Sequence, residues 1–588
     1  MVKRKTIQRA ALSAALSVCI AGGAYAQSTT GSIHGTVPSA STGTTIVQIT
    51  NNSGFNRTVT ADANGRYNFN ALPVGNYKVT VQHDGQVVGT REVTVIVGAG
   101  TDASFAGAGG TTSTLETVNV TATAASAIDL TAVDTRTVFT AEQLQRLPIN
   151  RSAEAIALLA PGAVAGAGGF SALSGLVSFG GSGVSENAYY INGYFTGEPL
   201  SNLGGSGLPF FAIAQQETYT GGYSAKYGRS DGGVISQIGK RGTNDWEFGG
   251  EIRWAPKGLR EKRKDLYLPN LDLPDGYDYE DPEMAGTIYS RGKGEESSST
   301  TYSAYAGGPI VRDRLFFFAG AEVEDSKTLT NPDALSSPRS THGKSDDHNI
   351  YVKLDWNIND NHMLEATWLK QKDDYSGSYY SYDIDTGTEG NRLAIVPTPI
   401  VKENDYRIFK YIGYLSDNLT LSATYGNNEF TNQQINPGIL PGIPYVAGAT
   451  NQDPSITGGT PIPNRQGGYQ SRDGKNKTNG LRADLEWVVG DHTLSLGLDN
   501  IKFEASNEGT AQVADYWEYG RTSNPNGNLS AALGVGAPGG NGYFVRQLKY
   551  FNNTSMSLDQ KAWYLEDRWQ ITDNLLLSLG VRNDQFTN

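Results

Sequence analysis

Apolar and polar residues alternate along much of the chain from residue 244 to residue 588. In NIYVKLDWNI (349–358), apolar side chains occupy every second position: Ile350, Val352, Leu354, Trp356 and Ile358. The same period of two recurs in LTLSATYG (419–426) and LLLSLGVR (575–582). Because successive side chains of a strand point to opposite faces, this pattern predicts strands with one apolar face. We expect about eleven of them in this region.

The lengths of the connections between these strands distinguish two kinds of β-protein. Short polar turns occur at 311–315, 357–363, 415–420, 488–494 and 571–576. Long segments lie between them, at about 256–298, 326–344, 372–402, 428–477 and 506–557. A soluble β-sandwich would alternate as well, but it rarely contains several loops longer than about 15 residues. Short turns that alternate with long loops are typical of an outer-membrane β-barrel.

Residues 27–106 have a different composition and predict a small all-β domain. In GRYNFNALPVGNYKVTVQHDG (65–85), alternating segments are separated by proline and glycine, as in a sandwich. The stretch 60–81 also resembles the carboxypeptidase-regulatory-like domain, through Asp62, Gly65, Tyr67, Phe69, Leu72, Pro73, Gly75, Tyr77 and Val79. Residues 27–106 contain no HxxE pair, and His34 and His83 stand apart, so we predict a binding domain or spacer without a zinc site.

Residues 125–243 begin with helical spacing and continue with a glycine-rich sequence. TAEQLQRLPINRSAEAIALLAPG (140–162) places leucine and isoleucine at helical intervals and ends on Pro161-Gly162. The glycines that follow contain no GK[ST] and no GxGxxG that opens a helix, which disfavours nucleotide binding. No HExxH is present either, so the sequence predicts no enzyme active site.

This middle region resembles the plug domain of TonB-dependent outer-membrane receptors. The similarity includes Leu147-Pro148, residues 158–162, Ile191, and residues 222–229 with Gly232-Gly233. As the plug motif we select Glu186, Asn187, Tyr190, Asn192, Gly193, Tyr223, Tyr227, Gly228 and Arg229. Residues 307–324 and 562–582 resemble barrel strands of the Oar-like branch of these receptors. The resemblance implies an α/β plug inside a transmembrane barrel.

A short alternating run, LETVNVTATA (115–124), connects the first domain to the plug-like region. Its position resembles that of the TonB box, which we assign to Glu116, Thr117, Val118, Asn119, Val120, Thr121 and Ala122. An extended peptide without proline pairs its backbone with the edge of a partner's sheet, and this requires little side-chain identity. The alternative is a linker strand packed on a neighbouring domain.

The N-terminus has the three parts of a secretory signal. Lys3, Arg4, Lys5 and Arg9 precede the apolar stretch 10–23, and Ala24 and Ala26 occupy the small-residue positions of a cleavage site. The apolar stretch is shorter than the roughly 20 residues that span a bilayer. Cys19 is the only cysteine, so the expected mature chain offers no disulfide, zinc knuckle or thiol nucleophile. A formal charge of −13 disfavours nucleic-acid binding.

These observations predict a multidomain chain in five parts. They are a signal peptide (1–26), a carboxypeptidase-regulatory-like β-sandwich (27–106), a linker with the TonB box (107–124), an α/β plug (125–243) and half of an antiparallel transmembrane β-barrel (244–588). Outer-membrane transporters close with about 22 strands. We therefore expect a fragment that folds as a curved open sheet around the plug. The missing part would be about as long as residues 244–588.

The resemblance implies a receptor in the Gram-negative outer membrane that moves a large or scarce solute, energised by the periplasmic protein TonB. Siderophore, glycan, peptide and protein cargo all remain open. Rival readings are an adhesive outer-membrane protein and a secreted carbohydrate-binding protein. We predict no cofactor and no metal site, because the acidic loops lack the EF-hand spacing and the residues near His342 and His348 are typical of solvated loops.

Overall fold

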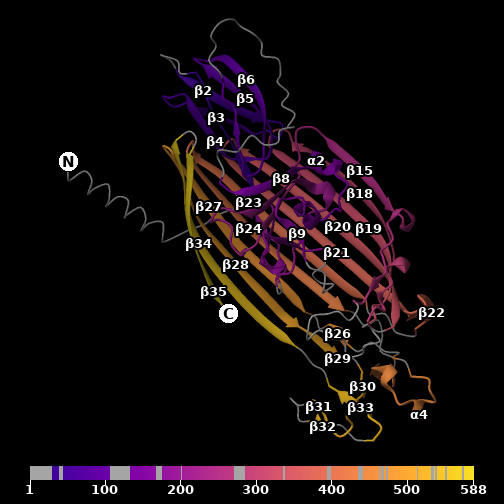
Figure 1. Cartoon of the computed structure of the whole chain (residues 1–588). Coiled ribbons are helices and arrows are strands. Elements are labelled where there is room, and N and C mark those ends of the chain that lie inside the picture. The colour runs from indigo at the N-terminus through magenta and orange to yellow at the C-terminus, as the bar shows by residue number, and fades with distance from the viewer. Residues whose placement is uncertain are drawn as a thin grey trace.

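The computed structural model describes most of the chain after residue 28. The described residues are 29–38, 44–105, 133–166, 175–199, 202–269, 285–334, 338–393, 399–434, 442–462, 464, 469–471, 474–512, 514–530, 535–536, 540–549, 553–572 and 575–588. They form three bodies that are visible in Figure 1: an N-terminal domain, a plug domain, and a large curved sheet that we call the wall.

The N-terminal domain is a β-sandwich, as the sequence predicts. Its strands are β1 (Thr30–Thr36), β2 (Thr45–Asn51), β3 (Asn56–Thr60), β4 (Arg66–Pro73), β5 (Gly75–His83), β6 (Gln86–Val95) and β7 (Gly100–Asp102). One sheet has the order β4-β1-β7 and the other β3-β2-β5-β6. The alternating apolar residues of β4 and β5 point into the core, where Phe69 and Val79 are fully buried.

The plug domain is a mixed sheet with short helices, which confirms the α/β expectation. The sheet has the order β12-β11-β14-β13-β8. Its elements are β8 (Thr135–Thr140), β11 (Ala188–Ile191), β12 (Tyr194–Phe195), β13 (Ile213–Gly221) and β14 (Val234–Gly239), with α2 (Ala141–Arg146), α3 (Ala153–Ala157), β9 (Ala163–Ala165) and β10 (Val177–Phe179) beside it. Thr140 caps α2 in a reciprocal arrangement with Gln143. Among the helices described, none is long and apolar enough to cross a membrane.

The wall is a single antiparallel sheet in which eleven strands follow one another. They are β15 (Glu247–Ala255), β18 (Glu296–Val311), β19 (Leu315–Thr330), β20 (Arg339–Asn359), β21 (His362–Asp383), β23 (Ile400–Ser416), β24 (Leu419–Gln434), β27 (Lys475–Val489), β28 (His492–Glu508), β34 (Thr554–Thr572) and β35 (Leu575–Thr587). In the described residues β15 and β35 form its two edges and do not pair with each other. The wall is thus an incomplete barrel that curves around the plug, as expected (Figure 1).

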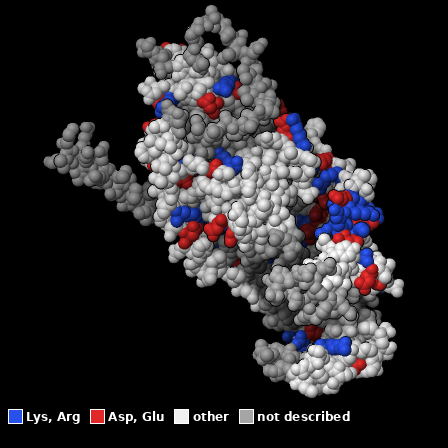
Figure 2. Space-filling model, in the orientation of Figure 1, with Lys and Arg blue, Asp and Glu red and all other residues white. Residues whose placement is uncertain are grey.

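The two ends of the wall differ. Short turns and the N-terminal domain lie at one end, and the longer connections with α4 (Pro454–Thr457), β30 (Tyr516–Arg521) and β33 (Tyr543–Leu548) lie at the other (Figure 1). The expected long loop at 326–344 is wrong, because β19 runs to Thr330 and β20 begins at Arg339. Their polar ends continue to pair, since the backbone ladder does not depend on apolar side chains. After β15, exposed basic residues gather on one side of the molecule (Figure 2): Lys257, Arg260, Lys262, Arg263 and Lys264.

The wall has reversed polarity compared with a soluble sheet. Its convex face exposes large apolar side chains such as Trp356, Trp487 and Leu579, whereas charged residues such as Lys353 and Asp499 are buried on the concave face. An apolar exterior around a polar interior is the pattern of a sheet that faces lipid. The concave face is therefore the surface on which a functional site is expected.

Candidate functional site

The tip of the plug's β11–β12 hairpin is built to reach the wall. Asn192 and Gly193 both have positive φ, 49° and 86°, as a two-residue hairpin turn requires. The Asn192 amide donates to the hydroxyl of Thr367 on β21 at 3.0 Å, and its oxygen accepts from the Gly239 N–H at 2.8 Å. This turn therefore joins the plug sheet to the concave face of the wall.

Tyr194, the next residue, sits in a recess of the wall formed by two glycines. Gly426 of β24 and Gly480 of β27 are cross-strand neighbours. A Cβ at Gly426 would lie 2.4 Å from the Tyr194 ring, so a side chain there would displace the tyrosine. The Tyr194 hydroxyl donates to Thr478 Oγ1 at 3.1 Å. The absence of side chains at Gly426 and Gly480 therefore leaves the space that the Tyr194 ring occupies.

The first of two buried ion clusters forms where Arg229 of the plug meets the wall. Arg229 is 3.1 Å from Asp499, which also lies 2.9 Å from Arg582 and 3.5 Å from Arg482. The Arg229 Nε donates to Gln560 at 2.5 Å. We call Arg229, Arg482, Asp499 and Arg582 the Arg229 cluster. Its single shared carboxylate holds plug and wall arginines together.

The second cluster lies on the link between the plug and β15. Arg241 is 2.5 Å from Asp355 and 3.0 Å from Glu365, and Lys353 is 3.0 Å from Glu365. We call Arg241, Lys353, Asp355 and Glu365 the Arg241 cluster. Removing one member of such a buried set leaves an uncompensated charge and costs about 3–5 kcal/mol. Both clusters therefore join the plug to the wall through charged side chains, beside the apolar packing of plug residues such as Phe211 on wall residues such as Phe318.

The remaining residues of the predicted plug motif stabilise the plug itself. The buried Asn187 amide donates to the Val177 carbonyl at 2.6 Å and accepts from the Gly233 N–H at 3.0 Å. The Glu186 carboxylate accepts from the Gly183 N–H at 2.9 Å. Tyr190, Tyr223 and Tyr227 form an edge-to-face aromatic cluster, in which the Tyr190 hydroxyl donates to the Gly228 carbonyl at 3.2 Å. Gly228 itself faces the Arg582 guanidinium, where a Cβ would lie 2.4 Å away.

A carboxyl group is buried inside the plug on β13. Glu217 is fully buried, and burial raises its pKa to about 7 although Arg136 and a 2.9 Å hydrogen bond from the Tyr219 hydroxyl oppose the shift. The residue lies where the N-terminal domain meets the plug, because a Cβ on Gly98 would be 2.8 Å from its Oε1. The protonation of Glu217 near neutral pH therefore affects the plug's interior.

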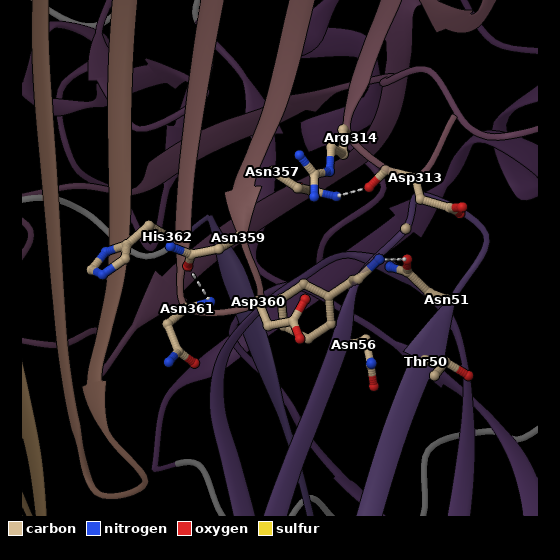
Figure 3. Close-up of a pocket in the computed structure, with 12 residues that line it drawn as sticks. Thr50, Asn51, Asn56, Asp313, Arg314, Asn357, Asn359, Asp360, Asn361 and His362 are labelled. Atoms are coloured by element: carbon tan, nitrogen blue, oxygen red, sulfur yellow. Dashed lines mark hydrogen bonds between the residues drawn. The ribbon is translucent and has the colours of Figure 1, made fainter. Parts of the chain in front are cut away.

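Two hollows border the junction of the three bodies. One, of about 490 Å³, is lined by Gln215, Gly239 and Arg241 of the plug side and by Lys353 and Glu365 of the wall. The other, of about 750 Å³, is a polar groove between the β2–β3 turn and the wall turns at Asp313 and Asp360 (Figure 3). In the described residues, no three His, Cys, Asp or Glu side chains gather closely enough to hold a metal ion.

Two sets of predicted site residues cannot be placed. The proposed TonB box, Glu116 to Ala122, and the cleavage-site residues Ala24 and Ala26 all lie outside the described residues.

Sequence reasoning found Arg229 but missed the charged wall residues of both ion clusters. Asp499, Arg582 and Asp355 occupy the face of their strands opposite the apolar positions, as Asp355 does in NIYVKLDWNI. Charged residues at such positions are the signal that was available, but nothing in the sequence shows which plug residue each one meets.

Three family models match successive parts of the chain. Residues 32–108 match the carboxypeptidase regulatory-like domain, and residues 129–235 match the TonB-dependent receptor plug domain. Residues 327–588 match the outer membrane beta barrel domain. The order of the matches is the order of the three bodies in the structure.

Individual proteins are similar to parts of the chain. The chain is 32% identical over 170 residues to the TonB-dependent transporter Oar of Myxococcus xanthus, a match that covers 29% of this chain and 14% of Oar. The outer membrane transporter YddB of Escherichia coli has a similar fold, with a TM-score of 0.51 and 16% identity, over 77% of this chain and 56% of YddB. The ferric enterobactin receptor PfeA of Pseudomonas aeruginosa matches with a TM-score of 0.49 and 14% identity, over 78% of this chain and 58% of PfeA.

The chain thus spans little more than half the length of these solved structures and a smaller part of Oar. The plug, the lipid-facing wall and the N-terminal domain match their family models in the expected order. The chain therefore matches the plug model of TonB-dependent receptors and the outer membrane beta barrel model, and it is similar to the TonB-dependent transporter Oar over 29% of its length.

Proposed function

We propose that the protein is a TonB-dependent transporter that moves a large or scarce solute through the lumen closed by its plug. The observation that carries this proposal is the seat of the plug: Arg229 and Arg241 enter buried ion clusters on the concave face of the wall. A plug held by charges can leave that face when water enters, because each separated charge is solvated again.

TonB supplies the force in this proposal. It binds the segment Glu116 to Ala122 as an added β-strand and pulls on the plug from the periplasm. The first plug strand, β8, pairs along β13 and is the nearest described plug element in sequence. The pull therefore reaches β8 first and, through β13, the rest of the plug sheet.

Two further partners, lipid and an extracellular ligand, are assigned from the convex face and the far end of the wall. Outer-membrane lipid surrounds the apolar convex face, and an extracellular ligand (a glycan, peptide or siderophore) enters from the end with the long connections. The protein performs no covalent chemistry and needs no cofactor in this scheme. The domain limits proposed from sequence, 27–106, 107–124, 125–243 and 244–588, assign one task to each part: periplasmic binding or spacing, coupling, closure and passage.

The experiment begins by finding a probe solute. Cells with the gene at its own locus and a deletion strain are compared for uptake of iron-55 enterobactin, fluorescent maltoheptaose and a fluorescent oligopeptide mixture. The solute that only the first strain accumulates is the probe solute. The variant Val118→Pro removes a backbone donor from the proposed strand, and we expect it to reduce uptake of the probe solute at least about tenfold.

The matched control is Thr112→Pro, which places proline in the preceding linker and is expected to transport normally. Surface amounts of both variants are measured by antibody binding to whole cells. Normal uptake by Val118→Pro at normal surface amounts contradicts the coupling role. The absence of any transported solute, together with loss of cell adhesion in the deletion strain, would favour the adhesive alternative.

A further inference from the structure

The N-terminal domain is docked on the wall through the turn between β2 and β3. The Asn52 carbonyl accepts from the Asn244 N–H at 2.8 Å, and the Ser53 carbonyl accepts from the Asn357 amide at 2.8 Å. A Cβ on Gly54, whose φ is +68°, would lie 2.2 Å from the Asp313 carbonyl oxygen. The turn is therefore seated on the backbone of the short wall turn at Asp313, at the edge of the polar groove (Figure 3).

Beside this turn, the domain shares a hydrophobic core with the concave face of the wall. The Arg57 guanidinium lies 4.0 Å from the centre of the Tyr414 ring, and Phe55 meets the same ring edge-on at 5.8 Å. The Tyr414 hydroxyl donates to the Ala71 carbonyl at 2.7 Å. Ile412, two residues before Tyr414 on β23, is fully buried in the same cluster. These side chains face the lumen, so the domain covers part of the lumen at this end.

The domain also contacts the plug and so bridges both sides of the passage. The Val97 N–H donates to the Gln215 side chain of the plug at 3.0 Å. On the wall side, the ammonium of Lys410 contacts the Thr29 hydroxyl. The domain thus lies across the gap between the plug and β23 at the end of the wall with short turns.

We propose that the N-terminal domain is a second, periplasmic gate, which must leave the wall before a solute passes. Its latch is the set Asn52, Ser53, Phe55 and Arg57, which binds Asn244, Asn357 and Tyr414. The described part of the domain ends at Phe105 and that of the plug begins at Val133, so the proposed TonB box lies between gate and plug in sequence. Force that TonB applies to this segment therefore acts on both the gate and the plug. This inference rests on the proposed transport function.

The first test measures whether the domain covers the lumen, and it needs no ligand. Cys19 is the only native cysteine and lies in the expected signal peptide, so Ile412→Cys provides a single reporter. Whole cells are treated with a small sulfonated maleimide that enters the periplasm through porins. We expect slow labelling, which Arg57→Ala accelerates about tenfold or more by removing the cation–π contact.

Two controls match this test. Arg66→Ala removes an exposed arginine of the same domain, 3.4 Å from Asp491 of the wall, and is expected to change labelling less than about twofold. Asn418→Cys, on an exposed wall turn, is expected to label rapidly in every background. If Ile412→Cys labels as fast as Asn418→Cys without any other change, or if Arg57→Ala has no effect on a normally exported protein, the gate is overturned.

The second test locks the gate. The side chains of Asn52 and Asp245 touch at 2.5 Å, and both residues are exposed. We expect a short, reducible bis-methanethiosulfonate reagent to join Asn52→Cys to Asp245→Cys, to reduce uptake of the probe solute at least about tenfold, and to be removed by dithiothreitol with recovery of uptake. Each single-cysteine variant should transport normally after the same treatment. Failure to crosslink in a normally exported protein, or normal uptake with the crosslink intact, overturns the gate, whereas normal uptake by Val118→Pro contradicts the proposed function instead.

Discussion

The wall is contacted by two different bodies, and it uses different chemistry for each. The plug is held by charge, through the Arg229 and Arg241 clusters, and also by aromatic packing such as that of Tyr194 on Tyr406. The N-terminal domain is held by an aromatic contact at Tyr414 and by backbone hydrogen bonds at the wall turns. The Arg229 cluster lies in the middle of the concave face, whereas the Arg241 cluster lies beside the N-terminal domain at the end with short turns.

The difference indicates what each contact does when water arrives. Charges that separate inside a lumen regain hydration. The ion clusters therefore hold the plug more strongly when water is excluded from the lumen than when water enters it. The aromatic contact of the N-terminal domain loses apolar burial on separation, so water does not help it to open. The comparison predicts that the plug seat depends on individual charges and that the gate depends on packing.

The largest expected effect comes from the shared carboxylate of the Arg229 cluster. Asp499→Ala leaves Arg229, Arg482 and Arg582 facing one another, and we expect the plug seat to lose about 3–5 kcal/mol. Hydrogen–deuterium exchange of plug residues 188–195 in detergent would then accelerate. Unchanged exchange in a wall that remains folded would show that the cluster does not hold the plug.

The next effect is a pH dependence within the plug. Because the folded pKa of Glu217 is raised to about 7, the folded state keeps a proton that the unfolded state releases above about pH 4.5. Plug stability therefore falls as the pH rises from about 4.5 to 7, by roughly 3 kcal/mol at most. Glu217→Gln should remove this slope in exchange measurements on β13. A slope that persists in the variant contradicts the assignment.

A smaller effect is expected at the gate. Tyr414→Phe keeps the ring under Arg57 but removes the hydrogen bond to the Ala71 carbonyl, a loss of about 1 kcal/mol. Labelling of Ile412→Cys should accelerate about fivefold, less than with Arg57→Ala. An effect as large as that of Arg57→Ala would mean that the hydroxyl, and not the ring, carries the contact.

The smallest effect is expected at the exposed pair between the N-terminal domain and the wall. Asp491→Ala removes the partner of Arg66 at 3.4 Å, where both side chains are more than half exposed. We expect a change below about 0.5 kcal/mol in the docking of the domain, measured by the same labelling. It is the matched control for Asp499→Ala, since the same substitution is made at a solvated carboxylate.

Sequence predicted the elements of this molecule better than their contacts. Alternation in NIYVKLDWNI predicted which residues of β20 share a face, because this depends on local strand geometry. The end of β19 at Thr330 was not predicted, because polar strand ends have no apolar alternation to reveal them.

The site was predicted only in part. Arg229 was selected from a resemblance, but its role became visible only with Asp499, 270 residues further along the chain. The docking of Arg57 on Tyr414 was not predicted at all. Both contacts depend on how separate sheets meet, and the two-residue period of a strand carries no information about its partner across the lumen.

The most direct test of the account is a crosslink between the plug and the wall. A Cβ on Gly580 of β35 would lie 2.9 Å from the Cβ of Ala225 in the plug, so separating these positions by roughly 1 Å gives the Cβ spacing of a disulfide, about 3.5–4.5 Å. In resting cells, Ala225→Cys with Gly580→Cys is expected to form this disulfide almost completely, while either variant alone stays reduced. If both cysteines remain free in an exported, folded protein, the plug does not lie against the concave face and the account is contradicted.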